Sequence, residues 1–384
     1  MANHKNNFKG IFLAAAAAAL FGMSTPLAKL LEKEIAPVML ASLFYLGFGI
    51  GFALLSALAA SRKKQGKVLL LSRADLPSLM VVVTAGGIFA PVCLMLGLSY
   101  SSATTASLLL NLEAVLTALI AWIYFRENCD SKIILGMIAI TAGGIILSFN
   151  QFGFNQLSFD QASVNSALNL APSITAPLVS ISGPILIALA CLGWAIDNNF
   201  TRKIAAADAK QIAMIKGLVA GLVNLAFALA LGQKLPNVGA ITAALLLGFV
   251  GYGLSLVFYV MALRDLGNAR TSAYFATAPF LGALLSLVIF REPVTATLAL
   301  AALLMGIGVY LHISERHEHT HIHEETEHEH EHLHDLHHNH EHASGDEPTH
   351  RKNGSEIPHT HKHRHEGLKH SHTHYPDLHH RHRH

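Results

Sequence analysis

Ala118-Leu-Ile-Ala-Trp-Ile-Tyr-Phe-Arg-Glu127 and Ala283-Leu-Leu-Ser-Leu-Val-Ile-Phe-Arg-Glu292 are two copies of one pattern in this chain of 384 residues. Each copy is an apolar run that ends in Phe-Arg-Glu, and an offset of 165 residues separates them. The same offset aligns Gly143 with Gly308. The sequence therefore predicts an internal duplication, in which both halves of the chain contain the same succession of elements.

Both copies lie in a chain with the composition of a membrane protein. Hydrophobic residues make up 52% of it and charged residues only 14%, whereas a soluble protein carries about a quarter charged residues. Continuous apolar runs of about 20 residues predict membrane-spanning helices, because spanning strands would alternate. Ten spans are predicted, at approximately Gly10–Leu30, Pro37–Ala60, Pro77–Tyr100, Ala103–Phe125, Lys132–Phe149, Gly183–Thr201, Gln211–Gly232, Val238–Leu263, Ala269–Phe290 and Val294–Ile313.

Five spans per copy is an odd number, so the second copy enters the membrane from the opposite side. The predicted fold class is an all-α integral membrane protein, with ten transmembrane helices as two inverted five-helix repeats and a disordered C-terminal tail. The predicted boundaries are residues 1–149 for the first repeat, 150–182 for an extracytoplasmic connecting loop, 183–313 for the second repeat and 314–384 for the tail.

The charges of the loops predict the orientation. Fourteen Lys and Arg residues lie in the segments on the N-terminal side and four in the segments on the other side, which places both termini in the cytoplasm. Lys5 and Lys9 before an alanine-rich run resemble a signal peptide, but the repeat requires this run as its first helix. The predicted localisation is a multi-pass cell membrane, most simply a bacterial inner membrane.

The stretch from Gly97 to Glu127 resembles the EamA-type members of the drug/metabolite transporter superfamily, and Asn268 to Pro293 resembles the same motif. The likeness covers about residues 9 to 313. It implies a central cavity and transport, often export, of small organic metabolites such as amino acids. The family commonly has proline after the glutamate of the fourth span, where this chain has Ala114; the second copy keeps Pro279.

Two carboxylates lie inside predicted spans, where an ionised group is costly unless it has a partner. Glu113 is midway along the fourth span and Asp197 is deep in the sixth. Either could line the cavity and bind a substrate amine or the coupling proton, or could be a structural carboxylate bonded to a neighbouring helix. Asn111 is about 200° around the helix from Glu113, so if one lines the cavity the other packs between helices.

Further binding candidates surround these carboxylates. Asn198 follows Asp197, and Trp194 precedes it by three residues. Pro26 lies opposite this segment in the repeat, which predicts a pair of irregular helical segments near a binding site. Other aromatic candidates for substrate stacking are Tyr252, Tyr259 and Tyr274, although tyrosines of the core or of the membrane interface are the alternative interpretation.

The last part of the chain has a different chemistry. From His312 to His384 it contains 25 of the 26 histidines, in alternating runs with Glu, Thr and Lys. Such a segment predicts weak binding of Zn, Ni or Co without a closed site. The metal-binding candidates are His317, His319, His321, His323, His328, His330, His332 and His334.

These features leave three functional hypotheses. The first is a secondary transporter of organic metabolites, coupled to an ion such as H⁺, whose tail binds divalent metal ions. The second is a divalent-metal transporter whose tail collects cargo, and the third is a membrane-anchored metal buffer or pH sensor. No Walker loop, GxSxG or CxxC motif indicates an enzyme, and no cofactor is expected to be required. The expected partners are the lipid bilayer and a small-molecule substrate, with no nucleic acid, and a homodimer is compatible with the sequence.

Overall fold

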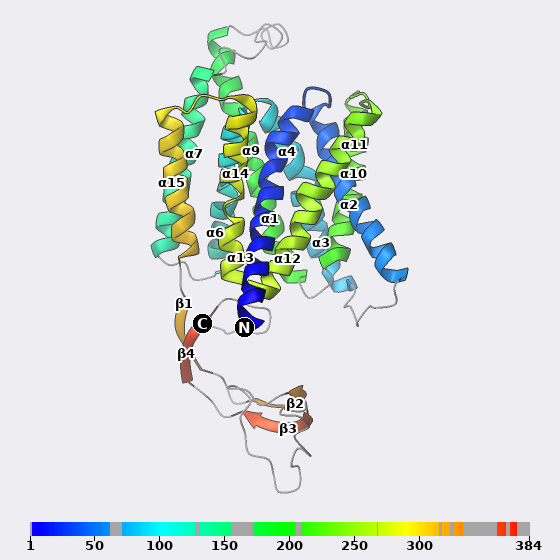
Figure 1. Cartoon of the computed structure of the whole chain (residues 1–384), viewed down its shortest axis with the longest axis vertical. Coiled ribbons are helices and arrows are strands. Elements are labelled where there is room, and N and C mark those ends of the chain that lie inside the picture. The colour runs from blue at the N-terminus through cyan, green and yellow to red at the C-terminus, as the bar shows by residue number, and fades with distance from the viewer. Residues whose placement is uncertain are drawn as a thin grey trace. The chain divides into compact units, whose positions relative to one another are not determined.

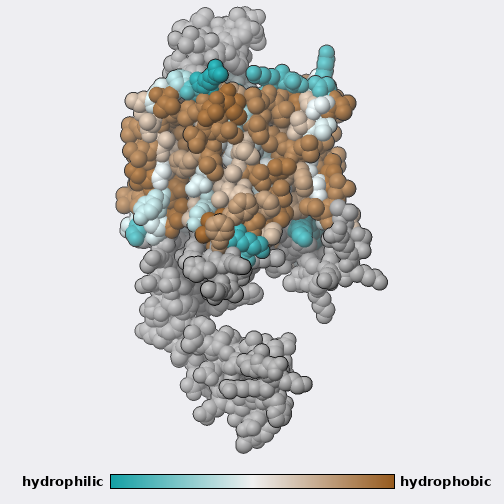
Figure 2. Space-filling view, in the orientation of Figure 1, coloured by the Kyte–Doolittle hydropathy of each residue, from teal (hydrophilic) through white to brown (hydrophobic). Residues whose placement is uncertain are grey.

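The structure, a computed structural model, describes residues 2–61, 71–126, 131–154, 172–204, 209–266 and 268–314, together with the tail segments 317–322, 326–332, 359–365 and 369–374. The chain forms two units, Met1–Glu315 and Arg316–His384. Figure 1 shows the first unit as a bundle of helices that run side by side. Figure 2 shows a broad hydrophobic belt around this bundle, with hydrophilic residues at its two ends.

Ten helical stretches of the described residues are long and apolar enough to cross a membrane, which confirms the predicted ten spans. Six spans are formed by α1 (Ala2–Leu31), α2 (Pro37–Ser61), α7 (Ser131–Phe154), α9 (Pro172–Thr201), α10 (Ala209–Ala230) and α15 (Ala296–Ile313). The third span combines η1 (Arg73–Asp75), α3 (Leu76–Val81), η2 (Val82–Phe89) and α4 (Ala90–Ser99), and the fourth combines α5 (Ala103–Leu109) and α6 (Leu112–Ile123). The eighth combines α11 (Val238–Leu247), η4 (Gly248–Leu254) and α12 (Ser255–Leu266), and the ninth combines α13 (Asn268–Phe275) and α14 (Ala278–Phe290).

The internal duplication is visible in the irregularities of these spans. The third and eighth spans each contain a π-helical segment, η2 and η4, at the offset of 165 residues to within one residue. The fourth and ninth spans are each interrupted by a two-residue turn, at residues 110–111 and 276–277. Arg126 and Arg291 end their spans in the left-handed conformation, with φ of 55° and 51°. These paired features support two repeats of one architecture.

Two boundaries differ from the sequence prediction. The helices α7 and α9 extend into the predicted connecting loop, to Phe154 and from Pro172, and residues 155–171 lie outside the described residues. The predicted irregular segments at Pro26 and Asp197 are absent, because α1 and α9 run through both positions as continuous helices. The paired irregularities lie instead in the third, fourth, eighth and ninth spans.

The tail unit contains four short strands among the described residues. Strand β1 (His317–Ile322) pairs antiparallel with β4 (Lys369–His374), and β2 (Thr326–His332) pairs antiparallel with β3 (His359–His365). In these four segments, the alternation of histidine with other residues has the strand period of two. The registers oppose histidine with histidine at His317–His374, His319–His372, His321–His370, His328–His363, His330–His361 and His332–His359.

Glycines set the closest helix contacts in the membrane unit. A Cβ at Gly308 of α15 would lie 2.7 Å from the carbonyl oxygen of Gly136, and one at Gly136 of α7 would lie 2.8 Å from that of Gly308. The two backbones therefore approach each other directly, as small residues allow in membrane helices. Gly306, on the same helix, has no neighbour within 4 Å of its Cβ position among the described residues.

Polar links join the helices on the face of the bundle opposite the N-terminus. The ammonium of Lys29 donates to the carbonyl oxygen of Leu98 and lies 3.2 Å from Oε2 of Glu32. The side chain of Glu32 is buried, and its Oε1 has no hydrogen-bond partner among the described residues. Burial raises the pKa of Glu32 from 4.5 to about 7, against the opposing effect of the Lys29 ammonium.

Replacing Gly308 by alanine tests the contact between α7 and α15. We expect Gly308→Ala to lower the melting temperature by several degrees, because overpacking of this kind costs roughly 1–3 kcal/mol. Gly306→Ala is the matched control, and we expect it to be neutral or slightly stabilising, since alanine is the better helix former. Thermal unfolding of the purified protein in detergent, followed by size-exclusion chromatography, measures both variants. Equal effects at the two positions would contradict the assigned contact.

The raised pKa of Glu32 predicts a pH dependence of stability. Between about pH 4.5 and 7 the Glu32 carboxyl keeps its proton in the folded state and loses it in the unfolded state. The contribution of Glu32 to stability therefore falls as the pH rises through that range. We expect Glu32→Gln, which stays neutral, to raise the melting temperature at pH 8 and to change it little at pH 5. Glu34→Gln is the control, because Glu34 forms an exposed hydrogen bond to Asn237. An effect of Glu32→Gln that does not change with pH would contradict the raised pKa of Glu32.

Candidate functional site

A buried ion pair lies inside the membrane unit, between α9 and α10. The ammonium of Lys216 contacts Oδ2 of Asp197. The other carboxylate oxygen, Oδ1, accepts a hydrogen bond of 3.0 Å from Oγ1 of Thr201, one turn further along α9. Asp197 is only 4% exposed, so the carboxylate depends on partners within the protein to remain ionised.

A second carboxylate stands beside this pair. Oε1 of Glu113, in the first turn of α6, accepts a hydrogen bond of 2.8 Å from Nδ2 of Asn198 on α9. Glu113 also interacts electrostatically with Asp197 and Lys216. Three ionisable groups from α6, α9 and α10 therefore share one polar region inside the membrane, which we call the charged site: Glu113, Asp197 and Lys216.

The π-helix η2 supplies free backbone carbonyls to the charged site. Pro91 has no N–H, so it cannot donate to the carbonyl groups one helical turn before it, at Gly86 and Gly87. The Gly86 oxygen accepts hydrogen bonds from Tyr45 Oη at 2.6 Å and Trp194 Nε1 at 3.1 Å. The Gly87 oxygen accepts one from Asn224 Nδ2 at 3.3 Å. Side chains thus replace the missing helical donors.

Glycine is required where η2 meets the carboxylate. A Cβ at Gly86 would overlap the carboxylate of Asp197, so any larger residue would displace it. Trp194 lies one helical turn before Asp197 on α9. Its ring nitrogen Nε1 is 3.4 Å from Oη of Tyr45. The charged site is therefore bordered by two aromatic side chains and by the backbone carbonyl to which they donate.

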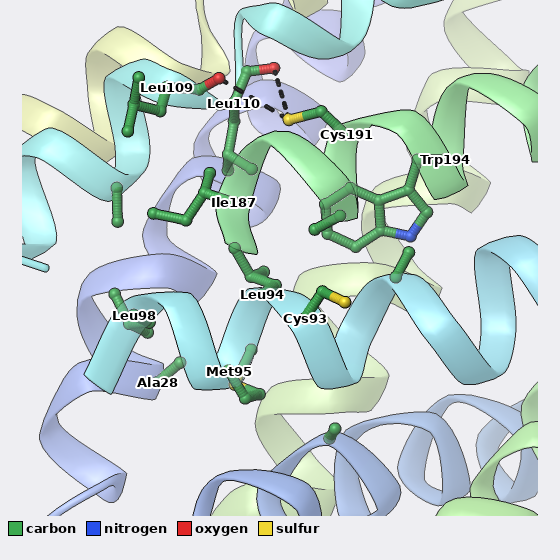
Figure 3. Packing of buried hydrophobic residues seen from close by; sticks show 14 of the residues in the cluster. Ala28, Cys93, Leu94, Met95, Leu98, Leu109, Leu110, Ile187, Cys191 and Trp194 are labelled. Carbon is green, nitrogen blue, oxygen red and sulfur yellow. Dashed lines mark hydrogen bonds between the residues drawn. The ribbon is translucent and has the colours of Figure 1, made fainter. Parts of the chain in front are cut away.

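The break in the fourth span packs against α9, as Figure 3 shows. The thiol of Cys191 points at the carbonyl oxygens of Leu109 and Leu110, with Sγ at 3.7 Å and 4.0 Å. Asn111 Nδ2 donates to the Leu108 oxygen at 2.9 Å, within its own span. The break begins the short helix α6, whose first turn carries Glu113.

The two repeats differ in charge at equivalent positions. The counterpart of Gly86 in the second repeat is Gly251, whose Cβ position lies 3.0 Å from Cβ of Ser24 on α1. Ser24 therefore occupies the position of Asp197, as the alignment of the two repeats also places it. The fold builds this contact without charge in one half of the molecule, so the ion pair is not a requirement of the architecture.

The predicted site residues fall into two groups. Trp194, Asp197, Asn198 and Glu113 come together in the charged site. Tyr252 lies against its border, with its ring 6.3 Å from that of Tyr45 and 5.6 Å from that of Phe21.

The other predicted residues bond elsewhere. Asn111 is buried and bonds to its own span. Tyr259 packs on Phe275 and bonds to Ser272 at 3.2 Å, and Tyr274 is partly exposed, with its carbonyl bonded by Thr277.

Sequence reasoning missed Lys216, Tyr45 and Gly86. Lys216 carried a usable signal, because it is the one basic residue in the interior of an otherwise apolar span, and the cost argument applied to the carboxylates applies to it equally. Tyr45 and Gly86 carried none, since their role depends on the loss of helical bonding at Pro91 and on packing between helices.

Within the described part of the chain, no group of three or more His, Cys, Asp or Glu side chains is arranged to hold a metal ion. Of the predicted metal-binding histidines, His317, His319, His321, His328, His330 and His332 lie in the tail strands. His323 and His334 lie outside the described residues.

Comparisons with known proteins agree with the fold. The chain is 25% identical over 296 residues to an uncharacterized transporter of Methanothermobacter thermautotrophicus, a match that covers 74% of this chain and 80% of that protein. A protein crystal structure with 18% identity superposes with a TM-score of 0.53, covering 80% of this chain and 95% of the other, which supports the fold alone. The model of the EamA-like transporter family matches residues 8–149 and 181–314. With ten membrane-spanning helices and a family match over both repeats, the chain belongs to the EamA-like transporter family of the drug/metabolite superfamily.

Proposed function

We propose that the protein is a secondary active transporter that exports small organic metabolites, such as amino acids or related compounds, by alternating access. The observation that carries this proposal is the charged site. Family membership makes the chain a transporter. Among the described residues, the buried Asp197–Lys216 pair occurs in one repeat, which supports a role in binding and not in holding the helices together. Intramembrane ionisable groups commonly mark substrate or ion pathways.

The irregular segments support the alternating-access part of the proposal. Broken and π-helical spans at matching positions of inverted repeats are where transporters of such architecture bind their substrates. Here η2 contacts α9 and α10, while η4 contacts α1 and α2. Each π-helix thus touches the first two helices of the other repeat, so rocking of one repeat against the other would alter both sets of contacts together.

The charge of the site also bears on direction and coupling. We propose that the N-terminal face of the bundle is cytoplasmic, on the loop-charge rule, and that an inward proton gradient drives export. The site contains two carboxylates and a lysine, and the sequence has no Walker loop for ATP.

We propose a regulatory or buffering role for the tail in metal binding. Its backbone registers oppose histidine with histidine at six positions, and imidazole suits Zn, Ni and Co. The alternative, a transporter of divalent metal, is disfavoured because no group of three or more His, Cys, Asp or Glu side chains among the described residues is arranged to hold a metal ion.

Transport by the Asp197→Asn variant tests the site. We expect the variant to insert and fold, and to lose at least tenfold in transport, because the amide cannot hold a cationic group or Lys216 as the carboxylate does. Vesicles containing the full chain are assayed with a panel of amino acids and related metabolites beside radiolabelled Zn²⁺, Ni²⁺ and Co²⁺. Asp265→Asn is the control, since it breaks an Asp–Lys pair of 3.8 Å with Lys9 that lies at the end of the bundle.

The panel separates the two functions. Movement of an organic solute without metal supports the metabolite transporter, and movement of metal alone supports the alternative. Full activity in Asp197→Asn would remove this residue from the mechanism. An equal loss in Asp265→Asn would show that a general change in stability, and not the site, explains the result.

Removal of the tail tests its separate role. The membrane unit and the tail are distinct compact units, so we expect deletion of residues 315–384 to leave a folded transporter with unchanged transport of the organic solute. The same deletion should abolish the binding of Ni²⁺, measured by isothermal titration calorimetry on both proteins. If the truncated protein is inserted and folded but inactive, the tail belongs to the transport pathway.

A further inference from the structure

The ammonium of Lys216 occupies a place that suits a cation from outside the protein. It contacts the Asp197 carboxylate, which itself lies against the Gly86 backbone. The Gly86 carbonyl oxygen already accepts hydrogen bonds from Tyr45 and Trp194, which brings these two aromatic side chains to the same region. A carboxylate, a carbonyl oxygen and aromatic rings form the set of groups that binds organic ammonium ions.

We propose that Lys216 is a tethered competitor of the substrate, and that the protein exchanges an ammonium-bearing organic cation for the proton of Lys216. This inference rests on the proposed transport function and adds to it the substrate class and the coupling. In the empty site, Lys216 neutralises Asp197. When a substrate ammonium takes the carboxylate, Lys216 becomes an amine and one proton leaves, so the total charge of the site is the same before and after binding.

The surroundings of Lys216 explain why its proton would leave. Of the elements packed against α10, α2 contributes Tyr45 and η2 contributes no ionisable group. Asp197 of α9 contacts the ammonium, and Glu113 of α6 interacts with it electrostatically. The helical neighbours Ile212 and Ala220 are buried and apolar. An ammonium without a counter-ion in such a place is strongly disfavoured, and beside a second cation it is more so.

Glu113 is a second carboxylate that the ammonium of Lys216 could pair with. If Lys216 moved from Asp197 to Glu113 on substrate binding, it would keep its proton and no proton would be released. Glu113 already accepts a hydrogen bond from Asn198. The release of a proton on binding therefore distinguishes deprotonation of Lys216 from a change of partner.

The asymmetry of the repeats gives independent support. Lys216 lies against Gly87, with its Cγ 3.4 Å from the Cβ position of that glycine. The counterpart of Gly87 in the second repeat is Tyr252, which packs on Phe44 of α2 at 6.0 Å between ring centroids. Among the described residues, Tyr252 packs on the rings of Phe21, Phe44 and Tyr45, so the second repeat packs this segment with aromatic rings in place of an ion pair.

The test is the binding of three ammonium probes to the full-length purified protein: methylammonium, 1,4-diaminobutane and 2-phenylethylammonium, with neutral 2-phenylethanol as the control. The chain has two tryptophans, so Trp122→Phe leaves Trp194 at the site as the fluorescent reporter. We expect at least one ammonium probe to bind about tenfold more tightly for each unit rise in pH, because one proton is released per cation bound. Calorimetry in two buffers of different ionisation enthalpy measures that proton directly.

Variants of Lys216 separate its charge from its proton. We expect Lys216→Met to bind the probe with no pH dependence and no proton release, since the competitor is gone. We expect Lys216→Arg to bind at least tenfold more weakly and to release no proton, because a guanidinium does not deprotonate. Glu113→Gln should leave the wild-type pH dependence in place.

Several outcomes would overturn the inference. They are probe binding that does not change with pH in the wild type, pH dependence that persists in Lys216→Met, or loss of proton release in Glu113→Gln. Failure of all ammonium probes while the vesicle panel shows transport of a neutral or anionic metabolite would reject the substrate class and leave the proposed function standing. Transport of metal alone in that panel would reject the proposed function itself.

Discussion

The low dielectric of the membrane interior is the constraint on which the rest of this structure depends. Every charged or backbone polar group placed there needs a partner within the protein. Asp197 satisfies this requirement with Lys216 and Thr201, and Glu113 satisfies it with Asn198. The charged site is therefore closed on itself in the empty protein, and a ligand can enter only by replacing one of these internal partners.

The same constraint explains the irregular helices. A break or a π-helical segment releases backbone carbonyls, and each released group finds a donor from another helix. Tyr45 and Trp194 serve the Gly86 oxygen, Asn224 serves the Gly87 oxygen, and Cys191 lies at the break in the fourth span. These donors come from α2, α9 and α10, so the irregular segments are tied to the helices that carry the charged site. A movement of those helices would change the bonding of the free carbonyls at the same time.

Much of the architecture could be predicted from the sequence, because apolar length and the repeated Phe-Arg-Glu ending are properties of single segments. The location of the irregular segments could not be predicted. Pro26 is tolerated within a continuous α1. The turn at residues 276–277 comes just before Pro279 in the first turn of α14, whereas the turn at residues 110–111 has no proline beside it. Asp197 and Glu113 could be identified from the cost of burying charge, but their partners could not, since Lys216 lies 19 residues from Asp197 and Asn198 lies 85 residues from Glu113 along the chain.

The contrast between the two repeats limits what the charged site can be. An ion pair that held the bundle together would be expected in both halves, since both have the same helix contacts around their π-helices. Instead Ser24 faces Gly251 where Asp197 faces Gly86, and Tyr252, the counterpart of Gly87, packs on aromatic rings whereas Gly87 lies against Lys216. Replacing a buried ion pair with apolar groups is often neutral or stabilising, so retention of the pair in one repeat alone has no structural advantage to explain it. A function that needs one cation site per molecule accounts for the asymmetry.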